Sequence, residues 1–89
     1  MTERRLRIVN RLGLHARAAS RFVRLANTFR CRIMVNKGNA RVDGKSILGL
    51  LTLAAAEGTT LALSADGDDE IEALDALEEL VLSRFGEEP

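Results

Sequence analysis

His15 is the one histidine of this chain, and it stands directly before a segment with helical periodicity. The backbone N–H groups at the start of a helix have no partner within the helix, so this position favours an anion. Arg17 follows two residues later, and its guanidinium group can bind phosphate through two parallel hydrogen bonds. An imidazole nitrogen is a nucleophile. The segment 13–19 therefore combines an acceptor for a phosphoryl group with groups that hold a phosphate.

Other chemical uses of His15 have less support. A zinc site needs several His or Cys ligands, and the chain has one histidine and one cysteine, Cys31. No nucleophile-elbow pattern is present, although composition leaves a Ser-His-Asp arrangement open. We expect neither a metal nor a cofactor, and we expect Cys31 to be buried and unreactive.

The helix that follows His15 is predicted to be basic on one side. Apolar residues recur at helical spacing from Ala16 to about Asn27, which indicates one buried face. Three arginines recur at intervals of four and three residues and therefore share another side: Arg17, Arg21 and Arg24. We expect Arg21 and Arg24 to face solvent, where they are available for docking.

Four strands are predicted from alternating apolar and polar residues. They span about residues 4–9, 31–36, 40–43 and 59–64. The element order is strand, helix, strand, strand, helix, strand, helix, with short connections. This order predicts an antiparallel sheet with the helices on one face, a two-layer α+β domain formed by residues 1–89.

Ser46 is predicted to cap a short second helix, because serine is a favoured N-cap residue. The residues that follow are apolar nearly all round, so part of this helix must stay exposed. Exposed apolar residues beside a basic patch indicate a protein-docking surface, here formed by Lys45, Ile47, Leu48 and Leu51. Ser46 also suits regulatory phosphorylation, which would add up to about two negative charges to that surface.

The last helix is predicted to begin after Asp68 or Asp69, with Glu72 as the capping-box partner of Asp69. Its apolar stripe runs to about residue 84 and consists of Ile71, Leu74, Leu77, Leu80 and Val81. Residues 86–89 are expected to form a tail.

Charge is distributed unevenly along the chain. Thirteen basic and thirteen acidic residues give a net charge of zero. Residues 1–45 carry twelve Lys or Arg and two acids, a charge of +10, whereas residues 46–89 carry one arginine and eleven acids, a charge of −10. A basic half steers acidic partners toward it and raises their association rates.

Composition narrows the classes of function. A nucleic-acid-binding domain is one alternative, suggested by the basic half, but three Phe with no Trp or Tyr form a poor base-stacking platform. No apolar run approaches the roughly 20 residues that cross a bilayer, and the N-terminus has no signal-peptide pattern. We therefore expect a cytoplasmic protein without membrane insertion, and a monomer suits a site that must be open to several partners.

Two segments resemble a known family. Gly13-Leu14-His15-Ala16-Arg17 and Lys45-Ser46-Ile47-Leu48-Gly49-Leu50 are similar to the two motifs of the HPr family, and they stand at the family's spacing. HPr proteins are the histidine phosphocarriers of the bacterial phosphoenolpyruvate-dependent phosphotransferase system. The resemblance covers nearly the whole chain, and the expected element order agrees with it.

The resemblance implies an open-faced β-sandwich with strand order 1-4-2-3 and three helices on one face. It implies that His15 accepts a phosphoryl group on Nδ1 from phosphorylated enzyme I and passes it to IIA-type proteins. Arg17 would stabilise the phosphohistidine, and Ser46 would be the target of an HPr kinase. Such a protein is a carrier rather than an enzyme.

The family's usual proline after the arginine is replaced by Ala18. Alanine is a good helix former, so the helix is expected to survive the change. Residues 53–58, LAAAEG, resemble the nitrogen-branch members of the family. A regulatory protein-binding switch and a sugar-transport carrier therefore remain the two alternatives within the family.

Overall fold

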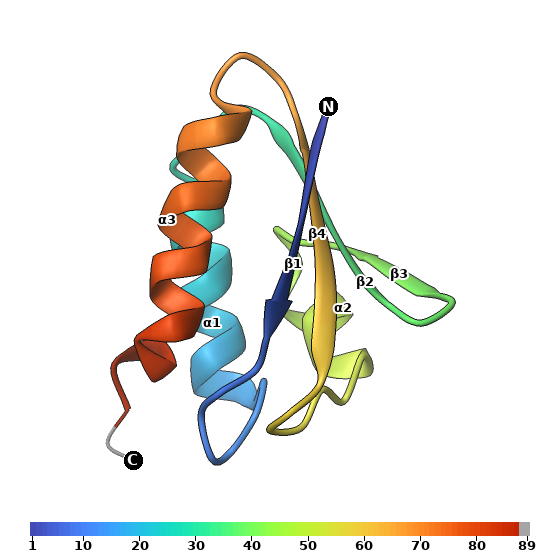
Figure 1. Cartoon of the computed structure of the whole chain (residues 1–89), viewed down its shortest axis with the longest axis vertical. Helices are drawn as coiled ribbons and strands as arrows, with labels where there is room; N and C mark the ends of the chain where they lie inside the picture. The colour runs from blue at the N-terminus through green and yellow to red at the C-terminus, as the bar shows by residue number, and fades with distance from the viewer. Residues whose placement is uncertain (88–89) are drawn as a thin grey trace.

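The computed structural model describes residues 1–87. Its helices are interspersed among the strands, with β2 and β3 in direct succession (Figure 1). In chain order they are β1 (Thr2–Arg7), α1 (Ala16–Ala26), β2 (Arg32–Lys37), β3 (Ala40–Asp43), α2 (Ile47–Thr52), β4 (Thr60–Asp66), α3 (Glu70–Leu82) and the 3-10 turn η1 (Arg84–Gly86).

The four strands form one antiparallel sheet in the order β1-β4-β2-β3. In Figure 1, α1 and α3 lie side by side against one face of this sheet. The short helix α2 packs against α1 and β3. The expected fold class, strand order and helical face are therefore confirmed.

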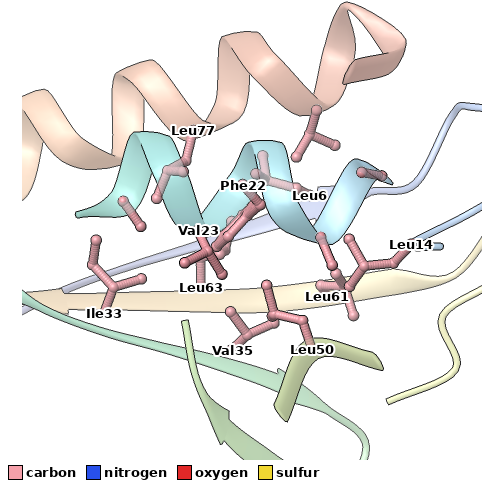
Figure 2. Close-up of a cluster of buried hydrophobic side chains, with 14 of the residues drawn as sticks. Leu6, Leu14, Phe22, Val23, Ile33, Val35, Leu50, Leu61, Leu63 and Leu77 are labelled. Atoms are coloured by element: carbon pink, nitrogen blue, oxygen red, sulfur yellow. The ribbon is translucent and has the colours of Figure 1, made fainter. Parts of the chain in front are cut away.

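The core lies between the sheet and the helices (Figure 2). Every second residue of a strand points toward the helices, as the alternating pattern requires. Leu61 and Leu63 of β4 and Ile33 and Val35 of β2 are buried there, facing Phe22 of α1. Cys31 is also buried, as expected, and burial raises the pKa of its thiol to about 11, with the nearby Asp69 carboxylate adding to the rise. The thiol therefore stays protonated and unreactive at neutral pH.

The first strand begins earlier than expected. It spans Thr2–Arg7 because these six residues pair with β4 from Ala65 back to Thr60. Ile8 lies beyond the strand but is buried, as is Leu6 within it, so the two apolar residues share the inward face.

The predicted capping box of α3 is wrong. Asp69 is the N-cap residue, but its carboxylate makes no capping bond. It accepts hydrogen bonds instead from the backbone N–H groups of Arg30 and Cys31, at 2.8 and 2.9 Å. Glu70, rather than Glu72, reaches back to a free N–H group, that of Gly67. Asp69 therefore joins the start of α3 to the segment that enters β2.

The apolar stripe of α3 is also narrower than predicted. Leu74, Leu77 and Val81 are buried and Leu80 is partly buried, but Ile71 is exposed. Ile71 lies in the first turn of α3, where the smaller Ala73 occupies the buried side of the helix. Ala73, which the predicted stripe did not include, is fully buried.

Of the expected tail at 86–89, the structure describes Gly86 and Glu87, and both are held against the rest of the fold. Phe85 is buried, and η1 packs against α1. Gly86 ends this turn and Glu87 follows it, whereas Glu88 and Pro89 lie outside the described residues. Within residues 1–87, no helix is long and apolar enough to cross a membrane.

Replacing Asp69 by Asn should lower the melting temperature at pH 7 by a few degrees. The backbone hydrogen bond from Arg30 is the main cause that holds the pKa of the Asp69 carboxyl below its ordinary value of 3.8. A lowered pKa in the folded state stabilises the fold above the unfolded pKa, and this stability is lost as pH falls through the folded value. The difference between the two proteins should therefore be full at pH 7 and shrink as pH falls below 3.8, the ordinary pKa of the carboxyl.

Asp68→Asn is the matched control, since Asp68 is exposed and is removed from the two N–H groups that Asp69 binds. Thermal unfolding followed by circular dichroism at several pH values measures both variants. Equal melting temperatures for D69N and D68N at pH 7 would show that the two backbone contacts contribute nothing to stability.

Candidate functional site

The loop before α1 is fixed by a close backbone approach. Gly13 has φ +68°, and a Cβ atom placed on it would lie 2.5 Å from the Ala55 carbonyl oxygen. Only glycine fits this position without strain. The next residue, Leu14, is buried and donates its N–H to the same carbonyl at 2.8 Å. The backbone of the residue after Leu14 is therefore held in a fixed position.

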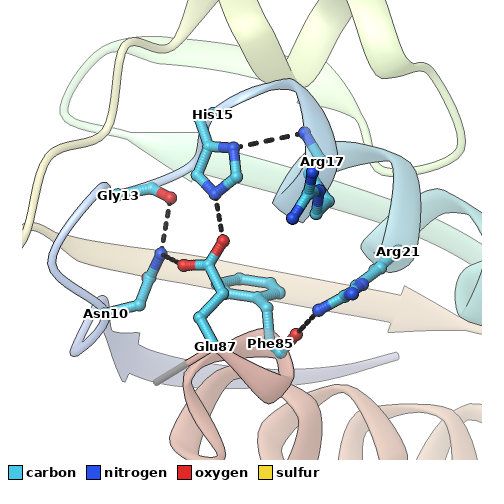
Figure 3. Close-up of polar contacts among 7 residues, drawn as sticks. All are labelled: Asn10, Gly13, His15, Arg17, Arg21, Phe85 and Glu87. Carbon is cyan, nitrogen blue, oxygen red and sulfur yellow. Dashed lines mark hydrogen bonds and ion pairs between the residues drawn. The ribbon is translucent and has the colours of Figure 1, made fainter. Parts of the chain in front are cut away.

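That residue is His15, and it is the N-cap of α1, as the sequence predicts. Its carbonyl accepts the first helical hydrogen bond, from Ala19 at 2.8 Å. Its Nδ1 atom accepts a bond from the backbone N–H of Arg17 at 3.3 Å (Figure 3). An acceptor at Nδ1 carries a lone pair and no proton. The imidazole side chain is 27% exposed, so this lone pair belongs to a group that a partner can reach.

The other ring nitrogen faces a carboxylate. Nε2 of His15 forms a short contact with Glu87, and the second carboxylate oxygen accepts a bond from the Asn10 amide at 2.9 Å. Figure 3 shows Glu87 lying between these two side chains. Burial alone would raise the pKa of the Glu87 carboxyl, but the hydrogen bonds from Asn10 and His15 together lower it. Glu87 is therefore an ionised acceptor in this contact.

Two contacts hold Glu87 in place. Phe85, two residues earlier, is buried in the core. Arg21 of α1 donates through its guanidinium group to the Phe85 carbonyl. Arg21 was expected to face solvent as a docking residue, but this contact turns it toward the C-terminal turn and leaves it only partly exposed.

The arginines beside His15 form a basic hollow. Its lining consists of Arg11, Leu12, Arg17, Arg21, Gly86 and Glu87. Arg17 and Arg24 are exposed on α1, as the stripe predicts. A phosphate bound to Nδ1 would have the N–H of Arg17 on one side and this hollow nearby.

The second predicted motif lies at the start of α2. Ser46 caps this helix, and its hydroxyl accepts the N–H of Gly49 at 3.0 Å. Three apolar side chains of the helix are exposed, as expected, and only Leu50 is buried: the exposed ones are Ile47 at 42%, Leu48 at 74% and Leu51 at 37%. Because α1 and α2 contact one another, this apolar surface adjoins the basic helix.

Lys45 differs from the other predicted docking residues. Its amine donates to the Phe29 carbonyl at 2.7 Å, and the side chain is partly buried. This contact joins the start of α2 to the segment after α1.

Sequence reasoning missed Asn10 and Glu87. Both contacts are long-range: Glu87 lies 72 residues from His15 and 77 from Asn10. The one available signal was Phe85, a large aromatic residue in a segment otherwise suited to a tail. Such a residue indicates a segment that packs onto the core.

Comparisons with known proteins agree with this geometry. A family model described as the PTS HPr component phosphorylation site matches residues 2–83. The phosphocarrier protein HPr of Neisseria meningitidis serogroup A is 48% identical over 87 residues, which cover 98% of each chain. The phosphocarrier protein HPr of Pseudomonas aeruginosa is 49% identical over 81 residues, or 90% of each chain.

A solved structure is similar over its full length. HPr from Thermoanaerobacter tengcongensis superposes with a TM-score of 0.96 at 47% identity and covers 100% of both chains. The match in sequence and in strand order extends beyond the two motifs to nearly every element. The chain belongs to the HPr family of phosphocarrier proteins of the phosphotransferase system.

Proposed function

We propose that this protein accepts a phosphoryl group from phosphorylated enzyme I on Nδ1 of His15 and passes it to IIA-type proteins. The observation that carries the proposal is the hydrogen bond from the Arg17 N–H to Nδ1. It supports an unprotonated Nδ1 at a helix N-terminus, the arrangement that an attacking nitrogen needs. Transfer then depends on positioning and on charge stabilisation, which the partner largely supplies.

Arg17 has the role of binding the transferred phosphate. Its backbone N–H already points at Nδ1, and its exposed guanidinium extends from the first turn of the same helix. A phosphate on Nδ1 carries negative charge into the positive end of the helix dipole.

The docking surface consists of the exposed arginines of α1 together with the apolar face of α2. Arg24 supplies charge, whereas Ile47, Leu48 and Leu51 supply apolar area. An acidic partner with an apolar patch complements this combination. Arg21 and Lys45 contribute indirectly, because both side chains bind backbone carbonyls of this chain.

Ser46 is the proposed site of regulatory phosphorylation by an HPr kinase. It stands directly before Ile47 and Leu48, so a phosphate there would place negative charge beside the docking surface. Such a charge would oppose the docking of an acidic partner. The alternative is a mainly regulatory, nitrogen-branch protein whose two phosphorylation states select different partners.

Replacing His15 by Ala should abolish labelling. Wild-type protein mixed with enzyme I, radiolabelled phosphoenolpyruvate and magnesium should acquire an acid-labile phosphate. Because His15 is the one imidazole of the chain, H15A should acquire none. An acid-labile label on H15A would overturn the assignment of this residue.

Replacing Arg17 by Ala should slow phosphoryl transfer about tenfold to a hundredfold while the melting temperature stays unchanged. The variant loses one charge-assisted contact to phosphate, and an exposed arginine contributes little to the fold. Arg41→Ala, on the distant strand β3, removes the same charge and is the control. Equal rapid-quench rates for R17A and R41A would show that Arg17 is only a surface charge.

Reversing the charge of Arg24 should reduce the association rate with enzyme I by several-fold at low salt. Electrostatic steering is screened by ions, so the loss should shrink as salt rises. Stopped-flow measurement compares Arg24→Glu with Arg41→Glu, which changes the same charge on the sheet. A steering role for α1 is ruled out if both variants associate at the same rate.

A further inference from the structure

We propose that Glu87 is a positioning residue for His15: its carboxylate holds the Nε2 proton, keeps Nδ1 unprotonated and balances the charge that the ring gains on phosphorylation. This proposal rests on the proposed function and names a residue that the two family motifs do not contain. Its basis is the chain of contacts from Asn10 through Glu87 to His15 (Figure 3).

The partners of the ring assign its tautomer. A neutral imidazole has one N–H donor and one acceptor. Nδ1 faces a backbone N–H, that of Arg17, and therefore must accept. Nε2 faces the Glu87 carboxylate and therefore must donate. The lone pair is consequently held on Nδ1, the nitrogen that attacks phosphorus in the proposed reaction.

Asn10 fixes the carboxylate in turn. Its side chain is fully buried, and its amide nitrogen donates to the Gly13 carbonyl at 2.7 Å and to Glu87 at 2.9 Å. Both partners are acceptors, so the NH₂ group must face them. Among residues 1–87 this orientation leaves the Asn10 Oδ1 atom buried without a partner. An unpartnered buried oxygen is unfavourable, and the loop tolerates this cost because both N–H groups of the Asn10 amide bind acceptors, the Gly13 carbonyl and the Glu87 carboxylate.

The backbone on either side of the contact is also anchored. Phe85 is 1% exposed, and its carbonyl is bound by Arg21 from α1. On the other side, Leu14 is buried against Ala55. Glu87 and His15 thus approach each other from two fixed segments, and their side chains remain 15% and 27% exposed.

Phosphoryl transfer creates a positive charge on the His15 ring, beside the Glu87 carboxylate. The Nδ1 lone pair forms a bond to phosphorus as the bond between phosphorus and the donor's leaving atom breaks, and that electron pair stays with the donor. No proton leaves the ring, since Nε2 keeps its hydrogen. The imidazole therefore becomes an imidazolium that carries the phosphoryl group. A carboxylate at Nε2–H stabilises this cation, as the aspartate does in a Ser-His-Asp triad.

Two substitutions of Glu87 separate the effect of its negative charge from its effect on the His15 tautomer. Glu87→Ala leaves Nε2 open to water and removes the negative charge. In Glu87→Gln, the Asn10 NH₂ group requires an acceptor, so the Gln oxygen should face Asn10 and the Gln NH₂ should face Nε2. Nε2 then accepts, and the ring proton moves toward Nδ1. The nearly isosteric Gln variant should therefore be the more damaging of the two.

Nitrogen-15 NMR of the ring measures the tautomer directly, since the chain has a single histidine. At a pH where the ring is neutral, the wild type should be mainly protonated at Nε2. E87A should show a mixture, and E87Q should shift toward the form protonated at Nδ1. Glu72→Gln makes the same charge change on the exposed face of the first turn of α3 and should match the wild type. A wild-type tautomer in both Glu87 variants would overturn the proposal.

Transfer kinetics complete the test. With phosphorylated enzyme I, E87A should transfer phosphate roughly tenfold more slowly than E72Q, because it loses one charge-assisted contact to the ring. E87Q should be slower still, because it loses the same contact and also places an N–H donor against Nε2. Phosphoramidate, a small donor that needs no docking surface, should give the same order. Equal rates in E87A, E87Q and E72Q would overturn the role of Glu87 and leave the carrier function intact. Failure of the wild type to accept phosphate would instead overturn the carrier function, while the ring spectra would still decide the tautomer.

Discussion

Gly13 passes so close to the Ala55 carbonyl that no side chain fits between them, and the geometry around His15 depends on this approach. The same carbonyl accepts the N–H of Leu14, so the loop is pinned one residue before the imidazole. Behind it, α1 is held by Phe22 and the two fully buried alanines, Ala18 and Ala19. A reactive side chain can be exposed and still precise when the backbone on both sides of it is anchored.

The sequence predicts the elements well where local pattern decides them. His15 and Ser46 cap α1 and α2 as expected, because a cap depends only on residues two or three positions away. The helix begins at Ala16 although Ala18 replaces the usual proline, since alanine carries no steric penalty there. Strand order and helical face follow from the connections together with the family resemblance.

Long-range contacts account for the parts of the site that could not be predicted. Asp69 has the residue type and position of a helix cap, yet its carboxylate binds Arg30 and Cys31 across the fold. Arg21 has the spacing of a surface stripe but binds the Phe85 carbonyl, 64 residues away. Periodicity shows which side of a helix is polar. It does not show which polar side chain meets another segment, because that depends on the packing of both.

The same distinction applies to charge. The split of +10 and −10 between the halves suggests a strongly bipolar molecule, but part of it is neutralised where β1 meets α3. Arg4 binds Asp75 at 2.7 Å and Glu78 at 3.0 Å. Arg17 and Arg24 on α1 are exposed, and neither takes part in this pairing. These two side chains leave positive charge on the helix that begins after His15, where it can attract an anionic partner or phosphate.

A carrier must release what it accepts, and this limits how strongly Glu87 can act in the role proposed for it. A fully buried carboxylate would stabilise the phosphorylated ring so strongly that onward transfer would slow. The pair is instead partly solvated, with 15% of the Glu87 side chain and 27% of the His15 side chain exposed. Water weakens the attraction between them, whereas Asn10 and Phe85 preserve its direction. The direction of the contact between Glu87 and Nε2 fixes the tautomer of His15 before each transfer, and the moderate attraction between the two groups keeps phosphorylation reversible.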